Sequence, residues 1–181
     1  VGPYSNSYLF RSADKVLLMS ATIMNKDAFC ETLGLPVNDV AFISIPSPFP
    51  VENRPIIASP IASMSFKNID KGLPKMAQAV KAILAAHPDE KGIIHCHSYK
   101  IAQYLKRNIR SKRLLTHNSM DREKKLKIHM ADPRPTVLLS PSMQEGVDLK
   151  GDLSRFQIIC KVPYPYLGDK LVKKRMNKWK W

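Results

Sequence analysis

The residues best suited to chemistry come directly after an apolar run near the end of the chain. Residues 136–139, Thr-Val-Leu-Leu, are typical of a buried strand, and residues 140–151 follow as Ser-Pro-Ser-Met-Gln-Glu-Gly-Val-Asp-Leu-Lys-Gly. Hydroxyl and carboxylate groups thus follow a strand, at the edge of an open α/β sheet where ligands bind. A ligand-free turn is the competing interpretation, since Gly beside an acid often marks nothing more.

A second polar group follows residues 92–97, Gly-Ile-Ile-His-Cys-His, which also indicate a buried strand. Ser98 comes next, where it can cap a helix or bind phosphate at the helix N-terminus. Tyr99 can stack on a nucleotide base or pack against the sheet. His95 and His97 would share one face of the strand, a spacing that zinc can use with a third ligand. The sequence offers no third ligand, so we expect no metal site.

Basic side chains are concentrated in two segments of the chain. The net charge is +14; residues 100–127 hold ten Lys or Arg against two acids, and residues 161–181 hold seven against one, so the rest of the chain is neutral. Clustered cations favour polyanions such as nucleic acids, because binding releases counterions from the phosphates. The alternative is a solvated helix surface.

The cysteine pattern and the hydropathy exclude several protein classes. Cys30, Cys96 and Cys160 lie far apart and form neither a metal pair nor a disulfide framework, which favours a reducing, intracellular setting. No apolar run approaches the roughly 20 residues of a membrane span, so no membrane partner is expected.

The first part of the chain reads as strand, helix and strand, followed by a linker. Strands are expected at residues 16–19 and 40–45, and Asn25 and Gly34 are suited to begin and end a helix between them. Three prolines in residues 46–50 exclude a helix or a central strand, and they predict an extended linker.

Strands and helices alternate over short connections in the rest of the chain. Pro74 is expected to open one helix, Ser98 to cap a second, and Asp121 and Glu123 to occupy the first turn of a third. Strands are expected at residues 92–97, 114–116, 136–139 and 156–162. This alternation predicts a doubly wound, mainly parallel α/β sheet flanked by helices.

Six short motifs occur in order along the chain. They are Ser20-Ala21-Thr22, Pro46-Ser47-Pro48-Phe49, His97-Ser98-Tyr99, His117-Asn118-Ser119-Met120-Asp121-Arg122, Ser142-Met143-Gln144-Glu145-Gly146-Val147-Asp148 and Lys161-Val162-Pro163-Tyr164-Pro165. Each alone is a weak signal. In this order the chain resembles the C-terminal RecA-like motor domain of superfamily 2 DNA helicases of the DinG and XPD family, from motif III to the turn before motif VI. The fourth pattern is one spacer residue shorter than the family's.

The fifth of these segments, Ser142 to Asp148, resembles motif V, and the resemblance implies two kinds of contact for the loop formed by this segment and Ser140. Ser140 and Ser142 would donate hydrogen bonds to DNA phosphates, while Glu145, Gly146 and Asp148 would approach the bound nucleotide. The alternative for the two acids is an ion pair with neighbouring Lys or Arg.

Further roles follow from the other motifs. Ser98, Tyr99, His117 and Arg122 would contribute to the nucleic-acid surface, although Arg122 could equally form an ion pair on a helix surface. Ser20 and Thr22 would couple the two motor domains.

The same resemblance implies a domain plan and a set of ligands. Residues 1–45 would end the first motor domain, residues 46–54 would be the linker, and residues 55–181 would be the second RecA-like domain, truncated before motif VI. ATP and Mg²⁺ would bind to the full-length protein, with single-stranded DNA and the N-terminal motor domain as partners. The chain has no Gly-x-x-x-x-Gly-Lys-[Ser/Thr] phosphate loop, so alone it is expected to bind no cofactor and to hydrolyse no ATP.

Two other functions are consistent with the sequence. One is a non-catalytic RecA-like module that binds nucleic acid or a protein through its basic surfaces. The other is a superfamily 2 protein that acts on RNA.

Overall fold

A computed structural model describes residues 2–21, 23–53, 55–143, 147–165 and 168–178 of the chain. The chain divides into two compact units, Val1–Ile57 and Ala58–Trp181. Within the described residues, the first unit contains short helices only: α1 (Gly2–Ser5), η1 (Asn6–Phe10), α2 (Lys26–Leu33), η2 (Val37–Asp39) and η3 (Val51–Asn53).

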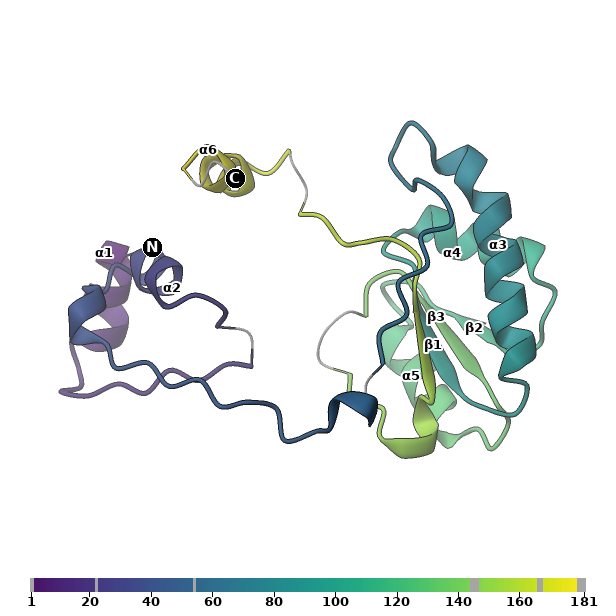
Figure 1. Cartoon of the computed structure of the whole chain (residues 1–181), viewed down its shortest axis with the longest axis horizontal. Helices are drawn as coiled ribbons and strands as arrows, with labels where there is room; N and C mark the ends of the chain where they lie inside the picture. Colours follow the sequence, from purple (N-terminus) through teal and green to yellow (C-terminus); the bar gives the residue numbers. More distant parts are fainter. Residues whose placement is uncertain (1, 22, 54, 144–146, 166–167, 179–181) are drawn as a thin grey trace. The chain divides into compact units, whose positions relative to one another are not determined.

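The second unit is built on a four-stranded sheet (Figure 1). Its strands are β1 (Gly92–His95), β2 (Leu114–Thr116), β3 (Val137–Ser140) and β4 (Phe156–Ile159), and its helices are α3 (Ile69–Ala86), α4 (Tyr99–Asn108), α5 (Arg122–Ala131), η4 (Gly151–Leu153) and α6 (Lys170–Lys178). The strand order is β2-β3-β1-β4, and every pair is parallel. The predicted α/β class, a parallel sheet flanked by helices, is therefore confirmed.

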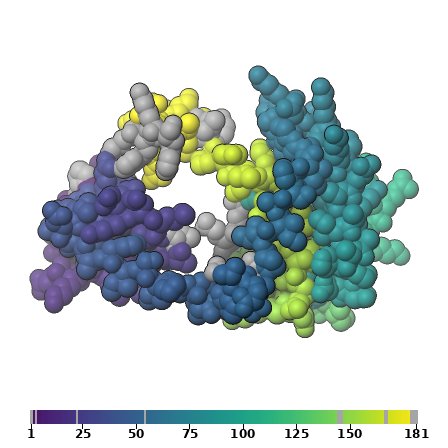
Figure 2. Space-filling model, viewed as in Figure 1, coloured from purple at the N-terminus to yellow at the C-terminus, as the bar shows by residue number. Residues whose placement is uncertain are grey.

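Helices cover both faces of the sheet. Successive strand residues point to opposite faces, so each face carries apolar side chains that pack against helices. On one face, Ile94 and Leu139 pack with the buried side chains of α3 and α4. On the other, Ile93 and Leu138 pack with Leu126 of α5. The residues from α3 to β3 form one closely packed body in the space-filling view (Figure 2).

Helix α3 begins earlier than the sequence indicated. Pro74 was expected to open it, but the helix starts at Ile69, and the carbonyl of Asn68 accepts hydrogen bonds from the N–H groups of Lys71 and Gly72. Pro74 lies on the exposed side of the helix, while Leu73 and Val80 are buried. The helix therefore continues through Pro74, which lacks an N–H group, because burial of its apolar stripe stabilises it.

The first unit agrees with the sequence at its helix and differs at its strands. Asn25 caps α2 by accepting from the N–H of Ala28 at 2.8 Å, and Gly34 ends it with φ 73°. Residues 16–19 and 40–45 were expected to be strands, and this was wrong: in the described residues neither is paired, and Leu17 and Ile43 are 80% and 82% exposed. A strand needs a neighbour's backbone groups, and in that part of the structure none pairs with them.

The last predicted strand is shorter than residues 156–162. β4 ends at Ile159, and the chain then passes through Pro163 and Pro165, which have no N–H group to donate to a sheet.

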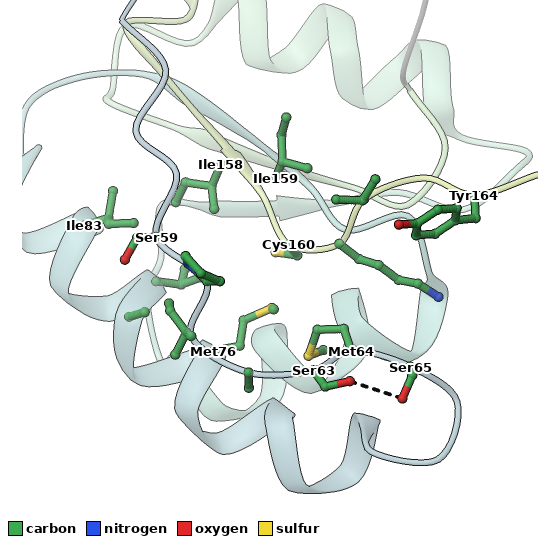
Figure 3. Close-up of a pocket in the computed structure, with 17 residues that line it drawn as sticks. Ser59, Ser63, Met64, Ser65, Met76, Ile83, Ile158, Ile159, Cys160 and Tyr164 are labelled. Carbon is green, nitrogen blue, oxygen red and sulfur yellow. Dashed lines mark hydrogen bonds between the residues drawn. The ribbon is translucent and has the colours of Figure 1, made fainter. Parts of the chain in front are cut away.

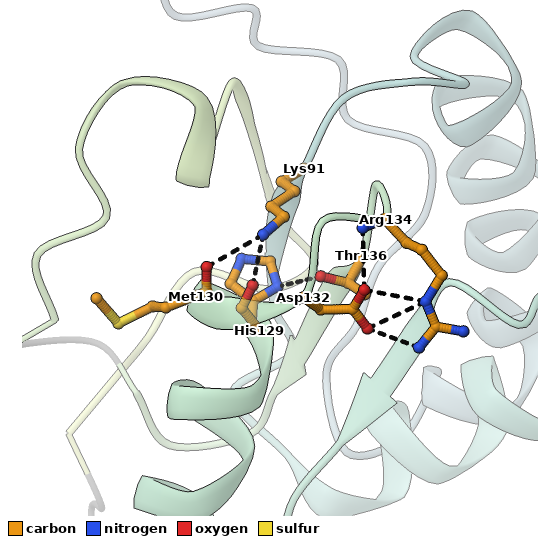
Figure 4. Close-up of polar contacts among 6 residues, drawn as sticks. All are labelled: Lys91, His129, Met130, Asp132, Arg134 and Thr136. Atoms are coloured by element: carbon orange, nitrogen blue, oxygen red, sulfur yellow. Dashed lines mark hydrogen bonds and ion pairs between the residues drawn. The ribbon is translucent and has the colours of Figure 1, made fainter.

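A buried polar cluster fixes the end of α5 (Figure 4). Lys91 donates through Nζ to the carbonyls of His129 at 2.7 Å and Met130 at 3.4 Å, which places a cation at the negative end of the helix. The His129 ring bonds to the Leu153 carbonyl through Nε2 and to the Thr136 hydroxyl through Nδ1, both at 2.9 Å. A carbonyl only accepts, so Nε2 carries the proton and Nδ1 accepts from Thr136.

Arg113 holds the connections at the amino end of the sheet. Its guanidinium donates to four backbone carbonyls, those of Leu84, His87, Glu90 and Pro135, at 2.7 to 3.0 Å. One side chain therefore joins the end of α3, the turn before β1 and the turn before β3.

Candidate functional site

The carboxyl ends of the parallel strands meet at one edge of the sheet. The N–H of Cys96 donates to the carbonyl of Ser140 at 2.8 Å, and the N–H of Cys160 donates to the carbonyl of His95 at 3.0 Å. The residues that follow β1, β3 and β4 are therefore adjacent. This edge holds five of the residues that the sequence analysis singled out: Ser98, Tyr99, His117, Ser140 and Ser142.

Ser140 organises the loop after β3 rather than facing solvent. Its side chain is 1% exposed, and its Oγ accepts from the N–H of Met143 at 2.7 Å and lies 3.1 Å from Nε2 of His117. Nδ1 of His117 lies 3.1 Å from the Asn118 carbonyl, so Nδ1 carries the proton and Nε2 accepts from the Ser140 hydroxyl. Both predicted nucleic-acid residues are thus buried and bonded to each other.

The turn from β2 into α5 is fixed by its own side chains. Oδ1 of Asn118 accepts from the N–H groups of Met120 and Asp121 at 2.8 and 2.9 Å, and Oδ1 of Asp121 accepts from the N–H of Asn118 at 2.7 Å. Arg122 follows, and its Nε is buried without a hydrogen-bond partner among the described residues. No ion pair of Arg122 occurs in that part of the chain, so the helix-surface pair is not formed there.

Ser98 and Tyr99 begin helix α4. Ser98 occupies the N-cap position with extended backbone, its carbonyl accepts from the N–H of Ala102, and its side chain makes no capping bond. The side chain of Ser98 is half-buried, and Tyr99 is 45% exposed rather than packed against the sheet. Both side chains are therefore accessible to a ligand at this edge.

The acidic end of the motif V loop is only partly described. Asp148 is exposed and forms an ion pair with Lys150 at 3.3 Å, which is the alternative that the sequence left open for it. Val147 and Leu149 anchor this stretch against Ile93 and Leu138. Glu145 and Gly146 lie outside the described residues, and Ser142 is exposed.

His95, the last residue of β1, and His97, two residues later, stack on each other. The ring centroids of His95 and His97 are 6.1 Å apart, and the described residues contain no group of three or more metal-binding side chains. Burial lowers the pKa of both rings, and for His97 the nearby His95 and Lys161 lower it further. His97 has φ 50°, the left-handed region that non-glycine residues rarely adopt.

A small pocket brings together His97 and residues 161–165, which the sequence analysis placed in two separate motifs. It has a volume of about 330 Å³ and is lined by His97, Lys161, Val162, Pro163, Tyr164 and Pro165. The sequence signal that could have identified this pocket was Lys161 and Tyr164, a basic residue and an aromatic residue that follow β4 at the same edge of the sheet as Ser98.

A larger pocket lies along the free edge of β4 (Figure 3). It has a volume of about 510 Å³ and lies between residues 59–65, helix α3 and residues 158–164. Met76, Ile83 and Ile158 give it an apolar lining, which suits packing rather than phosphate binding.

The interdomain residues belong to the other unit. Ser20 is exposed in the first unit, and Thr22 lies outside the described residues. Their coupling role stays a prediction.

Comparison with known proteins identifies one family. A model of the helicase C-terminal domain matches residues 80–180, more than half of the chain. A solved structure, "Structure of S. tokodaii Xpd4", is similar with 17% identity and a TM-score of 0.47; the match covers 66% of this chain and 23% of that chain. No curated protein matches. No helix of the described residues is long and apolar enough to cross a membrane.

Proposed function

Because the chain belongs to the helicase C-terminal domain family of DinG- and XPD-like proteins, we propose that it is the second motor domain of an ATP-dependent DNA helicase. In this role it supplies a surface for single-stranded DNA and one wall of the ATP cleft. The observation that carries the proposal is the gathering of Ser98, Tyr99 and Ser142 at the carboxyl edge of the sheet, inside the segment that matches the family.

The DNA surface combines hydrogen-bond donors with an exposed ring. The side chains of Ser98 and Ser142 are short donors of the kind that contact phosphates. Tyr99 supplies a ring on which a base of any sequence can stack. His117 and Ser140 are buried, so in this proposal they position the loops after β2 and β3 and do not contact the DNA strand. Arg122, whose Nε has no partner among the described residues, is available to support a phosphate beside them.

The nucleotide side of the proposal rests on the loop that contains Glu145, Gly146 and Asp148. The carboxylate of Asp148 is accessible, so it can exchange Lys150 for a ribose hydroxyl. ATP and Mg²⁺ would be bound with the first motor domain of the complete protein, which would supply the phosphate loop. Residues 1–45, including Ser20 and Thr22, would belong to that domain, residues 46–54 would be the linker, and residues 55–181 would be the second domain.

The DNA-binding test uses the purified 181-residue chain and a labelled dT oligonucleotide. Fluorescence anisotropy is expected to show binding that weakens as salt rises, because phosphate contacts release counterions. Tyr99→Ala is expected to lower the affinity by about 5- to 150-fold, from the loss of about 1–3 kcal/mol of base stacking. Tyr8→Ala, at a ring that is 77% exposed in the first unit, is the matched control and should change little.

Three results would decide against parts of this proposal. Binding that does not respond to salt would exclude phosphate contacts. Tighter binding to an rU oligonucleotide than to dT would favour an RNA substrate. ATP hydrolysis by the purified chain above a buffer blank, and its loss in Asp148→Ala, would contradict the expectation that this chain needs the other motor domain for catalysis.

A further inference from the structure

We propose that the pocket lined by His97, Lys161 and Tyr164, termed here the His97–Lys161 pocket, binds a nucleotide phosphate and lets the attached base stack on Tyr164. This inference rests on the proposed function, and it gives a ligand contact to three residues that stand in the sequence motifs but were assigned no role there. The phosphate could belong to a DNA strand or to a free nucleotide, and the test below separates the two.

The placement of the pocket follows from the pairing of β1 with β4. His95 is opposite Ile159 in the parallel register, and the N–H of Cys160 donates to the carbonyl of His95 at 3.0 Å. His97 and Lys161 each come two residues after these paired positions. The two chain segments therefore leave the sheet side by side and enclose a space of about 330 Å³. Ser98 and Tyr99 come directly after His97, so the pocket is continuous along the chain with the proposed DNA surface.

The charge of the lining suits an anion. Lys161 is half-buried, and the pocket lining contains no acidic residue among the described residues. Lys161 forms no ion pair within the same part of the chain, whereas Lys100 and Lys150 are paired with Asp70 and Asp148. A partly desolvated ammonium group without a counter-ion is stabilised by an anion that enters the pocket.

His97 adds a hydrogen-bonding group that is held in an unusual conformation. Its φ of 50° is strained for a residue with a side chain, and strain of this kind clusters at ligand sites. Its Nδ1 is buried without a partner among the described residues. The lowered pKa keeps the ring neutral at pH 7, with one N–H for a phosphate oxygen. A bound phosphate would favour the protonated ring, so binding should raise the pKa of His97.

Tyr164 supplies the stacking surface. The ring is 76% exposed although it lines the pocket. Pro163 and Pro165 flank it, and proline restricts the backbone, so the turn that carries the ring is stiffened. A lysine for the phosphate beside an aromatic ring for the base is the combination that sequence-independent strand binding uses.

The test compares charge and ring variants with matched controls in oligonucleotide binding. Lys161→Gln is expected to weaken dT binding about tenfold and to reduce the slope of log affinity against log salt by about one. Lys81→Gln, at an exposed lysine of α3 that lies outside both basic segments and has no ion pair in the described part of the chain, should change affinity by less than about twofold. Tyr164→Leu should weaken binding by about fivefold or more, and Tyr8→Leu should not.

Histidine NMR then locates the phosphate. The His97 ring signals are recorded across pH in the presence of a dT oligonucleotide, ATP or inorganic phosphate, with His129 as the internal reference. A raised pKa at His97 with the oligonucleotide alone assigns the pocket to the DNA backbone, and the same change with ATP assigns it to a free nucleotide. Thermal unfolding of each variant checks that it is folded.

The inference and the proposed function fail in different ways. If Tyr99→Ala weakens dT binding but Lys161→Gln acts no more strongly than Lys81→Gln, the pocket does not bind phosphate and the proposed function stands. An unchanged His97 pKa with all three ligands would lead to the same conclusion. If the unmodified chain binds dT without salt dependence, the proposed function fails, and the pocket inference fails with it.

Discussion

Nε2 of His117 lies 3.1 Å from Oγ of Ser140, so a single hydrogen bond joins the end of β2 to the end of β3. The same oxygen accepts the N–H of Met143, which fixes the start of the loop that carries the proposed nucleotide contacts. The first hydroxyl of the motif V region therefore acts on the shape of the loop.

Replacing Ser140 by Ala should destabilise the fold. The Met143 N–H and the His117 ring would both lose their buried partner, so the free energy of unfolding should fall by about 1–3 kcal/mol. Ser142→Ala, at an exposed hydroxyl two residues later, should stay within about 0.5 kcal/mol of the unmodified chain. Urea unfolding of the two variants measures the difference, and equal stabilities would show that the His117–Ser140 bond contributes nothing.

Replacing Arg113 by Lys should lower the free energy of unfolding, although both side chains carry a positive charge. One ammonium group cannot reach the four carbonyls that the guanidinium joins, and the loss should be about 3 kcal/mol. Arg110→Lys is the control, because Arg110 is exposed and forms no ion pair within the described residues. Denaturant unfolding reports the effect, and a shift shared by both variants would contradict the structural role of Arg113.

Stability should decrease as the pH falls below about 6.5. Burial lowers the pKa of His129 from 6.5, and nearby Lys91 also lowers it, so the unfolded chain binds a proton before the folded one. The contribution of a neutral His129 is complete above pH 6.5 and is lost as the pH falls through the lower, folded pKa. Thermal unfolding between about pH 7.5 and 5 should show this decline.

His129→Gln isolates this effect. Its melting temperature should be lower at neutral pH, because the bonds to Leu153 and Thr136 are disturbed, but it should depend less on pH over the same range. His87→Gln, at a partly exposed ring, is the control. A pH dependence unchanged in His129→Gln would assign the decline to other groups.

A second loss of folding stability, caused by protonation of Asp132, is expected in acid. Arg134 donates hydrogen bonds to the Asp132 carboxylate from its guanidinium and from its backbone N–H, and these bonds lower the pKa of Asp132 from 3.8 to about 2. The carboxylate therefore stabilises the fold above pH 3.8, and this contribution is lost as the pH falls toward 2. Asp132→Asn should remove that part of the acid dependence. Because the Asp132 charge also raises the pKa of His129, the variant should in addition lower that pKa further. Acid unfolding of the variant and the unmodified chain measures this, and identical acid transitions would contradict it.

Local signals in the sequence predicted much of the fold. The apolar runs that became β1, β2 and β3 were recognisable because strands buried on both faces are continuously apolar. The start and end of α2 were predicted from Asn25 and Gly34, whose chemistry acts over three or four residues. The early start of α3 was missed because proline preference was given more weight than the buried stripe around it.

Features that depend on distant residues could not be predicted. Residues 16–19 have the composition of a strand, but composition does not say whether a partner strand pairs with them. The resemblance implied a phosphate contact for Ser140 and, separately, a place on the nucleic-acid surface for His117, because sequence motifs do not show that side chains near the ends of different strands meet. The His97–Lys161 pocket was missed for the same reason, because His97 and Lys161 follow two strands, β1 and β4, that are neighbours only in the folded sheet.

The order of the strands sets the route by which this domain can fold. β1 is central, yet both of its neighbours, β3 and β4, come later in the chain. During synthesis Ile93 and Ile94 emerge from the ribosome before the residues of β3 and β4 that pair with them, and such non-local pairings are slow to form. A nascent or shortened chain that lacks residues 156–159 would therefore leave one side of its central strand unpaired, which makes it a candidate for chaperone binding or aggregation.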